Sequence, residues 1–151
     1  MKIRTRARAA LTATALTAGL VGGAIATAPS AAAAFPTCTS SGTLYGGSPT
    51  SWTTTMPAYY LASGAFVHTC NLRYGNTGEG VKTLQRALNL CYGTGLAADG
   101  SFGPATRTAL RSVQGRIGAG VDGIYGPETR DKMAWPAYAL SSHAYIGCHR
   151  Y

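Results

Sequence analysis

Hydrophobic residues recur at helical intervals in the middle of the chain. The segment GEGVKTLQRALNLCYG places Val81, Leu84, Leu88 and Cys91 at intervals of three, four and three residues. Because an α-helix turns once in about 3.6 residues, this spacing puts the four side chains on one helix face. Gly93 follows, and glycine commonly ends helices. The pattern therefore predicts a first, amphipathic helix in this segment.

Two shorter helices are predicted further along the chain, and each opens with the same dipeptide. Gly103-Pro104 and Gly126-Pro127 place proline at the first helical position, where its missing N–H removes no helical hydrogen bond. The third helix is expected to run from about Pro127 to Ala134. The second helix has an apolar side made of four residues: Ala105, Ala109, Leu110 and Val113.

An internal repeat underlies the two short helices. DGSFGPATRTAL begins at Asp99, and DGIYGPETRDKM begins at Asp122. Asp-Gly favours a turn in which the Asp side chain accepts nearby backbone N–H groups and Gly takes a positive φ. The aromatic residue is expected to fill the core, and Gly-Pro to start the next helix. The aspartates could instead contact a ligand and the aromatic residues a sugar, but we expect a structural role for all of the loop residues. They are Asp99, Gly100, Phe102, Gly103, Thr106, Asp122, Gly123, Tyr125, Gly126 and Thr129.

A duplicated turn–helix unit after a leading helix predicts an all-α fold. The expected architecture is a small three-helix bundle over residues 72–135, preceded by an irregular N-terminal arm at 35–71 and followed by a C-terminal tail at 136–151. Within the arm, three prolines interrupt any long helix. TSWTTTMPAYYL, from Thr50 to Leu61, suits either a short strand or an irregular packed arm.

The start of the chain, from Met1 to Ala34, has the pattern of an export signal. Four basic residues open it, an Ala/Leu/Thr/Val stretch follows, and alanines at 32–34 supply a small-residue cleavage site. Thr and Gly dilute the apolar stretch, whereas a membrane anchor needs about 20 strongly apolar residues. We therefore expect cleavage after Ala34, a secreted or cell-wall-associated product, and no stable membrane insertion.

Four cysteines lie outside this signal: Cys38, Cys70, Cys91 and Cys148. An even number in a short secreted chain indicates two disulfides, for which three pairings exist. The spacing resembles no zinc-ligand pattern. A protein with a small hydrophobic core gains substantially from cross-links, because each one stabilises the fold by about 3–4 kcal/mol by restricting the unfolded chain. The preferred pairing joins Cys38 to Cys70 and Cys91 to Cys148, although the sequence leaves all three open.

Charge narrows the possible partners. The chain has 13 Lys+Arg and 5 Asp+Glu, a formal +8, and four of the cations precede residue 35. Residues 35–151 therefore carry 9 minus 5, or +4. This mild and dispersed positive charge suits an anionic cell wall and is too weak to indicate nucleic acid. We expect a monomer.

The motifs of residues 72–133 resemble those of the peptidoglycan-binding type 1 domain family. They are a Leu-Arg-x-Gly opening at 72–75, a Val-x-x-Leu-Gln helix at 81–85, and Asp-Gly-x-aromatic-Gly-x-x-Thr loops at 99–106 and 122–129. Val113 and Cys91 depart from the family pattern, which usually has an aromatic residue and a glycine there. The resemblance implies a compact all-α module that tethers secreted wall-active proteins to peptidoglycan. We expect no cofactor and no metal.

Candidates for ligand contact are polar or aromatic residues off the apolar stripes. The tyrosine rings could stack on sugar rings, and the Asn and Gln side chains could hydrogen-bond the amide groups of a stem peptide. The arginines could pair with a carboxylate of that peptide. A solvated helix face explains the arginines equally well. The expected partner is peptidoglycan, through its glycan strand, its stem peptide or both. Six residues are proposed: Tyr74, Asn76, Gln85, Tyr92, Arg107 and Arg130.

Two other functions compete with wall binding. A small zinc-dependent cell-wall hydrolase would need three ligands and a general base, but His143 and His149 lack helical pair spacing and no acidic residue follows Asp131. We therefore expect no catalytic activity. A secreted interaction or inhibitor protein would use the uncharged aromatic arm, which could equally cover the core. The aromatic residues concerned are Trp52, Tyr59, Tyr60 and Phe66.

Overall fold

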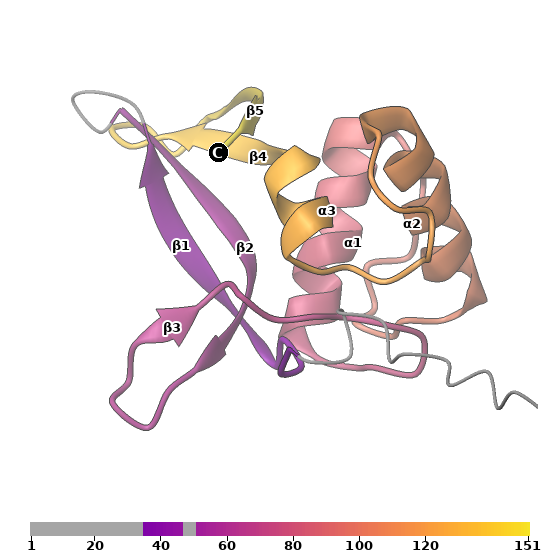
Figure 1. Ribbon diagram of the computed structural model, residues 1–151. Coiled ribbons are helices and arrows are strands. Elements are labelled where there is room, and N and C mark those ends of the chain that lie inside the picture. Colours follow the sequence, from indigo (N-terminus) through magenta and orange to yellow (C-terminus); the bar gives the residue numbers. More distant parts are fainter. Residues whose placement is uncertain (1–34, 47–50) are drawn as a thin grey trace, which may run out of the picture.

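The computed structural model describes residues 35–46 and 51–151, so the predicted export signal lies outside the described residues. Figure 1 shows a sheet beside three helices. The elements in chain order are β1 (Ser40–Gly46), β2 (Trp52–Tyr60), β3 (Phe66–Val67), α1 (Glu79–Tyr92), α2 (Pro104–Ile117), α3 (Pro127–Lys132), β4 (Ala134–Ala139) and β5 (Tyr145–Arg150).

The sheet takes its strands from both ends of the described chain. β1 pairs with β2 along its whole length, from Ser40 opposite Ala58 to Gly46 opposite Trp52. The antiparallel β4–β5 pair joins β2 at one end, where Trp52 lies opposite Ala139. The strand order is therefore β1-β2-β4-β5, and β3 pairs with the other end of β2 (Figure 1).

The prediction of an all-α fold is wrong. Residues expected to form an irregular arm and a tail instead build an antiparallel sheet of five strands. Their Thr, Tyr and Trp content suits a pleated, half-buried surface, which is the physical reason for the strands. The helices do not form a three-helix bundle either, because α1 packs against β2 and β4 as well as against α2.

The three predicted helices are present within this different architecture. α2 and α3 begin at Pro104 and Pro127, as the Gly-Pro pairs predicted. Gly93 caps the end of α1 and has the left-handed φ of 67° that glycine adopts without strain. Among the described residues, no helix is both long and apolar enough to cross a bilayer.

One hydrophobic core joins the sheet to the helices. Met56 of β2, Leu84 and Leu88 of α1, and Trp135 of β4 are at most 1% exposed. The Trp135 ring meets the Tyr125 ring edge-on, with centroids 5.9 Å apart. Sheet and helices therefore depend on the same buried contacts.

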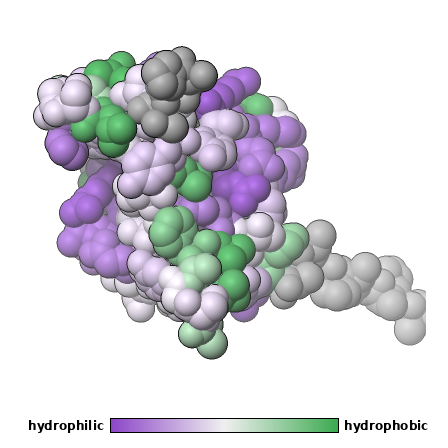
Figure 2. All heavy atoms as spheres, turned by 90° about the vertical axis from the view of Figure 1, so that its left-hand side faces the viewer, coloured by the Kyte–Doolittle hydropathy of each residue, from purple (hydrophilic) through white to green (hydrophobic). Residues whose placement is uncertain are grey.

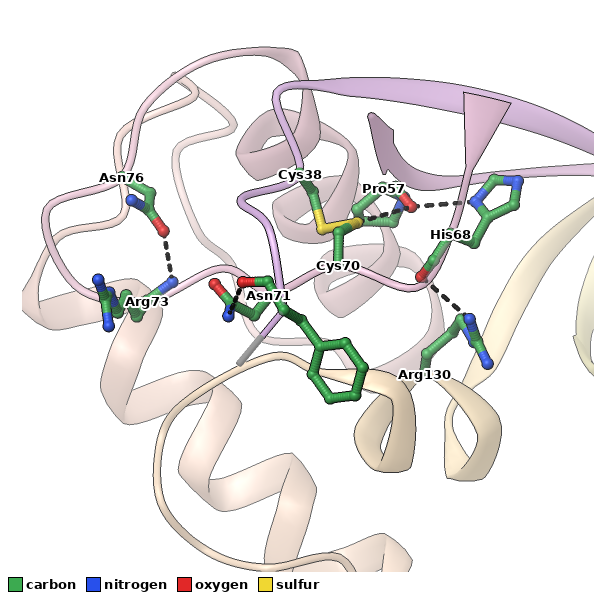
Figure 3. Close-up of a disulfide and its surroundings, with 9 residues drawn as sticks. Cys38, Pro57, His68, Cys70, Asn71, Arg73, Asn76 and Arg130 are labelled. Atoms are coloured by element: carbon green, nitrogen blue, oxygen red, sulfur yellow. Dashed lines mark hydrogen bonds between the residues drawn. A yellow bond between two sulfur atoms is a disulfide. The ribbon is translucent and has the colours of Figure 1, made fainter. Parts of the chain in front are cut away.

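Both disulfides have the pairing preferred from the sequence. Cys38–Cys70 is fully buried and joins the segment before β1 to the segment after β3 (Figure 3). Cys91–Cys148 joins the end of α1 to β5. Each bond therefore connects parts of the chain that are distant in sequence, with separations of 32 and 57 residues.

The sheet side of the molecule has a mixed surface. Figure 2 shows apolar residues gathered in its lower part, where the β2–β3 turn lies, and Tyr60, Leu61 and Phe66 are exposed there. Trp52 and Tyr59 are half-buried. The uncharged arm therefore partly covers the core and partly faces solvent.

Candidate functional site

A buried glutamine holds the first Asp-Gly loop against α1. The Gln85 Nε2 atom donates to Asp99 Oδ1 at 2.9 Å, to the Ser101 carbonyl at 3.0 Å and to Thr106 Oγ1 at 3.1 Å. The Gly100 N–H donates back to Gln85 Oε1 at 2.9 Å. One side chain therefore satisfies four polar groups of the loop and of the start of α2.

The second loop repeats this network on α2. Gln114 Nε2 donates to Asp122 Oδ1 at 2.8 Å, to the Ile124 carbonyl at 2.9 Å and to Thr129 Oγ1 at 3.1 Å. The Gly123 N–H donates to Gln114 Oε1 at 2.9 Å. The duplicated structural unit thus includes the helix before each loop, which the loop repeat did not reveal.

The remaining loop residues serve the fold. Asp99 accepts the Ser101 N–H at 2.8 Å, and this bond, followed by that from Gln85, lowers the pKa of the Asp99 carboxyl. Phe102 and Tyr125 are buried in the core. Burial raises the pKa of Tyr125, so its hydroxyl stays protonated.

Three of the six proposed ligand residues lie near the first loop or in its network. Gln85 is 1% exposed and its amide is fully used, so a ligand cannot reach it in this conformation. Asn76 Oδ1 accepts the Arg73 N–H at 2.8 Å and shapes the turn there (Figure 3). Tyr74, in contrast, is 59% exposed and free to contact a ligand.

The fourth, Tyr92, lines an open groove between the end of α1 and α2. The groove has a volume of about 650 Å³. The Arg116 guanidinium lies 5.5 Å from the centre of the Tyr92 ring, within the range of a cation–π contact. The Tyr92 hydroxyl accepts the Ala134 N–H at 2.7 Å, which fixes the ring at the groove wall.

The loop that forms the other wall of the groove is fixed by Asn89. Its Nδ2 donates to the Leu96 carbonyl at 2.8 Å, and its Oδ1 accepts the Leu96 N–H at 2.7 Å. Thr94 Oγ1 donates to the same Oδ1 at 2.8 Å. The groove is therefore held in shape before any ligand binds.

The groove combines hydroxyl, apolar and cationic groups. Its floor is α2, whose side chains at 105, 108, 109, 112 and 116 follow helical spacing. This stripe of Ala, Thr and Ser before an arginine was a signal that the sequence analysis did not use. Such a surface can hydrogen-bond sugar hydroxyls or amides and pair with a carboxylate. The groove residues with hydroxyl groups or charge, besides Tyr92, are Thr94, Thr108, Ser112 and Arg116.

Arg107 and Arg130, the remaining two candidates, have different surroundings. Arg107 is exposed, and its Cγ lies over Gly123, 2.9 Å from where a Cβ would be. The Arg130 side chain is 21% exposed and donates to Asp131 Oδ1 at 2.7 Å. It also donates to the His68 carbonyl at 3.0 Å (Figure 3). Neither lines the groove that contains Tyr92.

The histidines are dispersed. His68 is held by the Pro57 carbonyl and His149 stacks on Trp52 at 5.4 Å, whereas His143 lies in the exposed β4–β5 turn. Over residues 35–46 and 51–151, no three His, Cys, Asp or Glu side chains lie close enough together to hold a metal ion.

Comparison with known proteins finds a family match for the helical part of the chain. Residues 77–133 match the family model named "Putative peptidoglycan binding domain". The chain thus contains a domain of the peptidoglycan-binding family, and the whole groove between α1 and α2 lies within it.

Two similar proteins extend the comparison. The zinc D-Ala-D-Ala carboxypeptidase of Streptomyces albus G is 37% identical over 120 residues, which are 78% of this chain. The chain spans 42% of the length of that relative. A peptidoglycan-binding protein from Clostridioides difficile, solved in complex with glutamine hydroxamate, is 33% identical with a TM-score of 0.44, over 61% of this chain and 55% of that one.

Proposed function

We propose that the protein is a secreted, non-catalytic peptidoglycan-binding module that presents the α1–α2 groove to the cell wall. The observation that carries the proposal is the pairing of Tyr92 and Arg116 at 5.5 Å within a groove of the matched family segment. An aromatic face can contact the CH groups of a sugar ring, and the adjacent guanidinium can pair with a carboxylate. The groove therefore suits a place on peptidoglycan where a sugar meets its stem peptide.

A monomer working outside the cell is part of this proposal. Two disulfides support an oxidising compartment, and the excess of cations over acids suits an anionic wall. The relative from Streptomyces is a zinc carboxypeptidase, so hydrolysis of wall fragments is to be measured alongside binding, with and without added zinc. Release of stem-peptide amino acids would contradict the non-catalytic proposal.

The groove can be tested by filling it. Ser112 is exposed on α2 and lines the groove, so Ser112→Trp should block it without disturbing the core. We expect S112W to bind purified wall sacculi about tenfold more weakly, equivalent to about 1.4 kcal/mol. Ser141→Trp places the same bulk in the exposed β4–β5 turn and should bind as the unmodified protein does.

The cation can be tested separately. Arg116→Gln should weaken retention by about fivefold, because one charge-assisted contact contributes about 1 kcal/mol at an exposed site. Arg150→Gln removes an equal charge from exposed β5 and serves as the control. If S112W and R116Q bind like their controls, the groove is not the binding surface. Competition with soluble stem peptide and with peptide-free glycan then separates the two parts of the ligand.

A further inference from the structure

A second cavity lies between the sheet and α3, away from the α1–α2 groove. Its volume is about 200 Å³, and it shares no lining residue with the groove. Its walls come from β1, β2, the segment after β3, α3 and the residue after β5: Leu44, Met56, His68, Arg130, Asp131 and Tyr151. The matched family segment contributes Arg130 and Asp131 alone among these six.

Arg130 provides a positioned cation at this cavity. Its Nη1 donates to the His68 carbonyl at 3.0 Å (Figure 3). Its Nε donates to Asp131 Oδ1 at 2.7 Å, so the side chain is fixed on two sides. The Nη2 amino group has no hydrogen bond to the described residues. The guanidinium therefore keeps N–H donors for a carboxylate, and binding does not cost the free energy of ordering this side chain.

Asp131 and His68 provide acceptors beside this cation. The Asp131 side chain is largely exposed and has a second oxygen beyond the one that Arg130 uses. His68 Nδ1 donates to the Pro57 carbonyl at 3.0 Å, so Nε2 is the acceptor of the neutral ring (Figure 3). That Nε2 atom is buried and has no hydrogen-bond partner in the described residues, a condition that costs free energy unless a donor is supplied.

The size and the remaining walls limit the ligand. Leu44 and Met56 are apolar, and Tyr151 lies at the cavity as an exposed aromatic residue. The volume corresponds to roughly seven waters at about 30 Å³ each, and it is smaller than the cavities of about 300 Å³ or more that hold drug-sized molecules. The cavity therefore suits one or two small amino-acid residues.

We propose that this cavity binds the carboxylate end of an amino acid or short peptide whose last side chain is small and aliphatic. Arg130 Nη2 pairs with the ligand carboxylate, and Asp131 accepts the ligand N–H. Leu44 and Met56 contact the aliphatic side chain. This site does not depend on wall binding through the groove, and its test uses a free small molecule.

The experiment follows the methionine methyl groups of the purified protein by NMR. Met56 lines the cavity, whereas Met133 is fully buried elsewhere in the core and reports on folding. We expect a saturable shift of the Met56 methyl with N-acetylalanine. N-acetylalaninamide, which lacks the carboxylate, should bind at least about tenfold more weakly.

Three variants make the result specific. Arg130→Gln should weaken N-acetylalanine binding by about tenfold or more, whereas Arg111→Gln, exposed on α2 and outside the cavity lining, should leave it unchanged. Leu44→Trp fills the cavity, keeps both charges and should abolish binding. If the Met133 signal shows that R130Q has lost its fold, L44W decides the question. Equal binding of acid and amide, no saturable shift, or unchanged binding by L44W would overturn the proposal.

Discussion

At the residue scale, Gln85 and Gln114 each hold four polar groups in place while almost fully buried. Buried polar groups without hydrogen-bond partners cost free energy, and the two glutamine amides supply the partners of the polar groups around them. Corresponding bonds in the two networks have nearly equal lengths: the bond to the loop aspartate, for example, is 2.9 Å from Gln85 and 2.8 Å from Gln114. The duplication is therefore a duplication of hydrogen bonding as well as of sequence.

Replacing either glutamine should destabilise the protein strongly. Gln114→Leu keeps a similar volume and leaves the buried Gly123 N–H without an acceptor, so we expect a loss of about 2–3 kcal/mol. Gln85→Leu should cost a similar amount. Urea denaturation measures both, and Arg111→Leu, exposed on the same helix as Gln114, should change stability by less than about 0.5 kcal/mol. A loss below about 1 kcal/mol in both glutamine variants would contradict the argument.

The loops could be predicted from the sequence and their anchors could not. Asp-Gly dipeptides predict turns through local chemistry, and the structure has Gly100 and Gly123 at φ 78° and 74°. The two glutamines do not share the register of the loop repeat, because the connection from Gln85 to its loop is longer than the connection from Gln114 to the second loop. Their roles depend on tertiary contacts of helix with loop, which a repeat in register does not reveal.

His68 should make stability depend on pH. Burial is the largest cause that lowers the pKa of His68 below 6.5, and the nearby Arg130 charge lowers this pKa further. The hydrogen bond to the Pro57 carbonyl acts in the opposite direction. The unfolded chain therefore takes up a proton near pH 6.5 that the folded protein resists. The contribution of His68 is complete above pH 6.5 and is lost as pH falls towards the lowered pKa.

The pH dependence caused by His68 can be measured as the free energy of unfolding from above pH 6.5 down towards the lowered pKa of His68. His68→Gln should remove the decline below pH 6.5, and its amide can still donate to the Pro57 carbonyl. His143→Gln, in an exposed turn, should keep the decline. An identical pH profile for His68→Gln and the unmodified protein would show that another group is responsible.

At the element scale, helices were predicted and strands were largely missed. Apolar spacing and Gly-Pro starts are local signals, and they located α1, α2 and α3. The strands carry weaker signals, because Pro57 and Pro136 lie within β2 and β4 and proline argues against an inner strand. β4 also pairs with β2, Trp52 opposite Ala139, although all three helices lie between these strands in the sequence, and no local pattern encodes such a partner.

The disulfide between Cys91 and Cys148 should contribute substantially to stability. It closes a loop of 57 residues between α1 and β5, for which the chain-entropy model gives about 4 kcal/mol. The β4–β5 pair otherwise joins the rest of the sheet through a short contact with β2. We therefore expect the double variant Cys91→Ser with Cys148→Ser to lose about this amount in urea denaturation.

Hydrogen exchange locates the effect within the molecule. In the double variant, protection should fall first in β5 and β4, whereas α1 and α2 keep theirs below the unfolding midpoint. The Cys38–Cys70 bond remains intact in the double variant, so the two proteins differ only in the Cys91–Cys148 bond. A stability loss below about 1 kcal/mol would mean that the β4–β5 pair holds its place without the bond.

At the scale of the whole molecule, the family segment is not a separate body. Its helices share their core with Met56 of β2 and Trp135 of β4, which lie outside residues 77–133. The Trp135 indole N–H also donates to the Arg130 carbonyl in α3 at 3.1 Å. The sheet therefore completes the hydrophobic surface that short helices could not bury by themselves.

A shared core predicts a single cooperative unfolding transition. Tryptophan fluorescence reports on Trp52 and Trp135 in the sheet, and far-ultraviolet circular dichroism reports mainly on the helices, so the two midpoints should coincide in urea. Trp135→Phe removes the bond to Arg130 and part of the buried volume, so it should lower the free energy of unfolding by about 2–3 kcal/mol. Both urea midpoints should then fall together. Because Trp52 remains as the fluorescent reporter, the comparison holds in the variant too. A helical signal that persists after the fluorescence transition would instead mean that the helices fold without the sheet, and the core would then not be the feature that unites them.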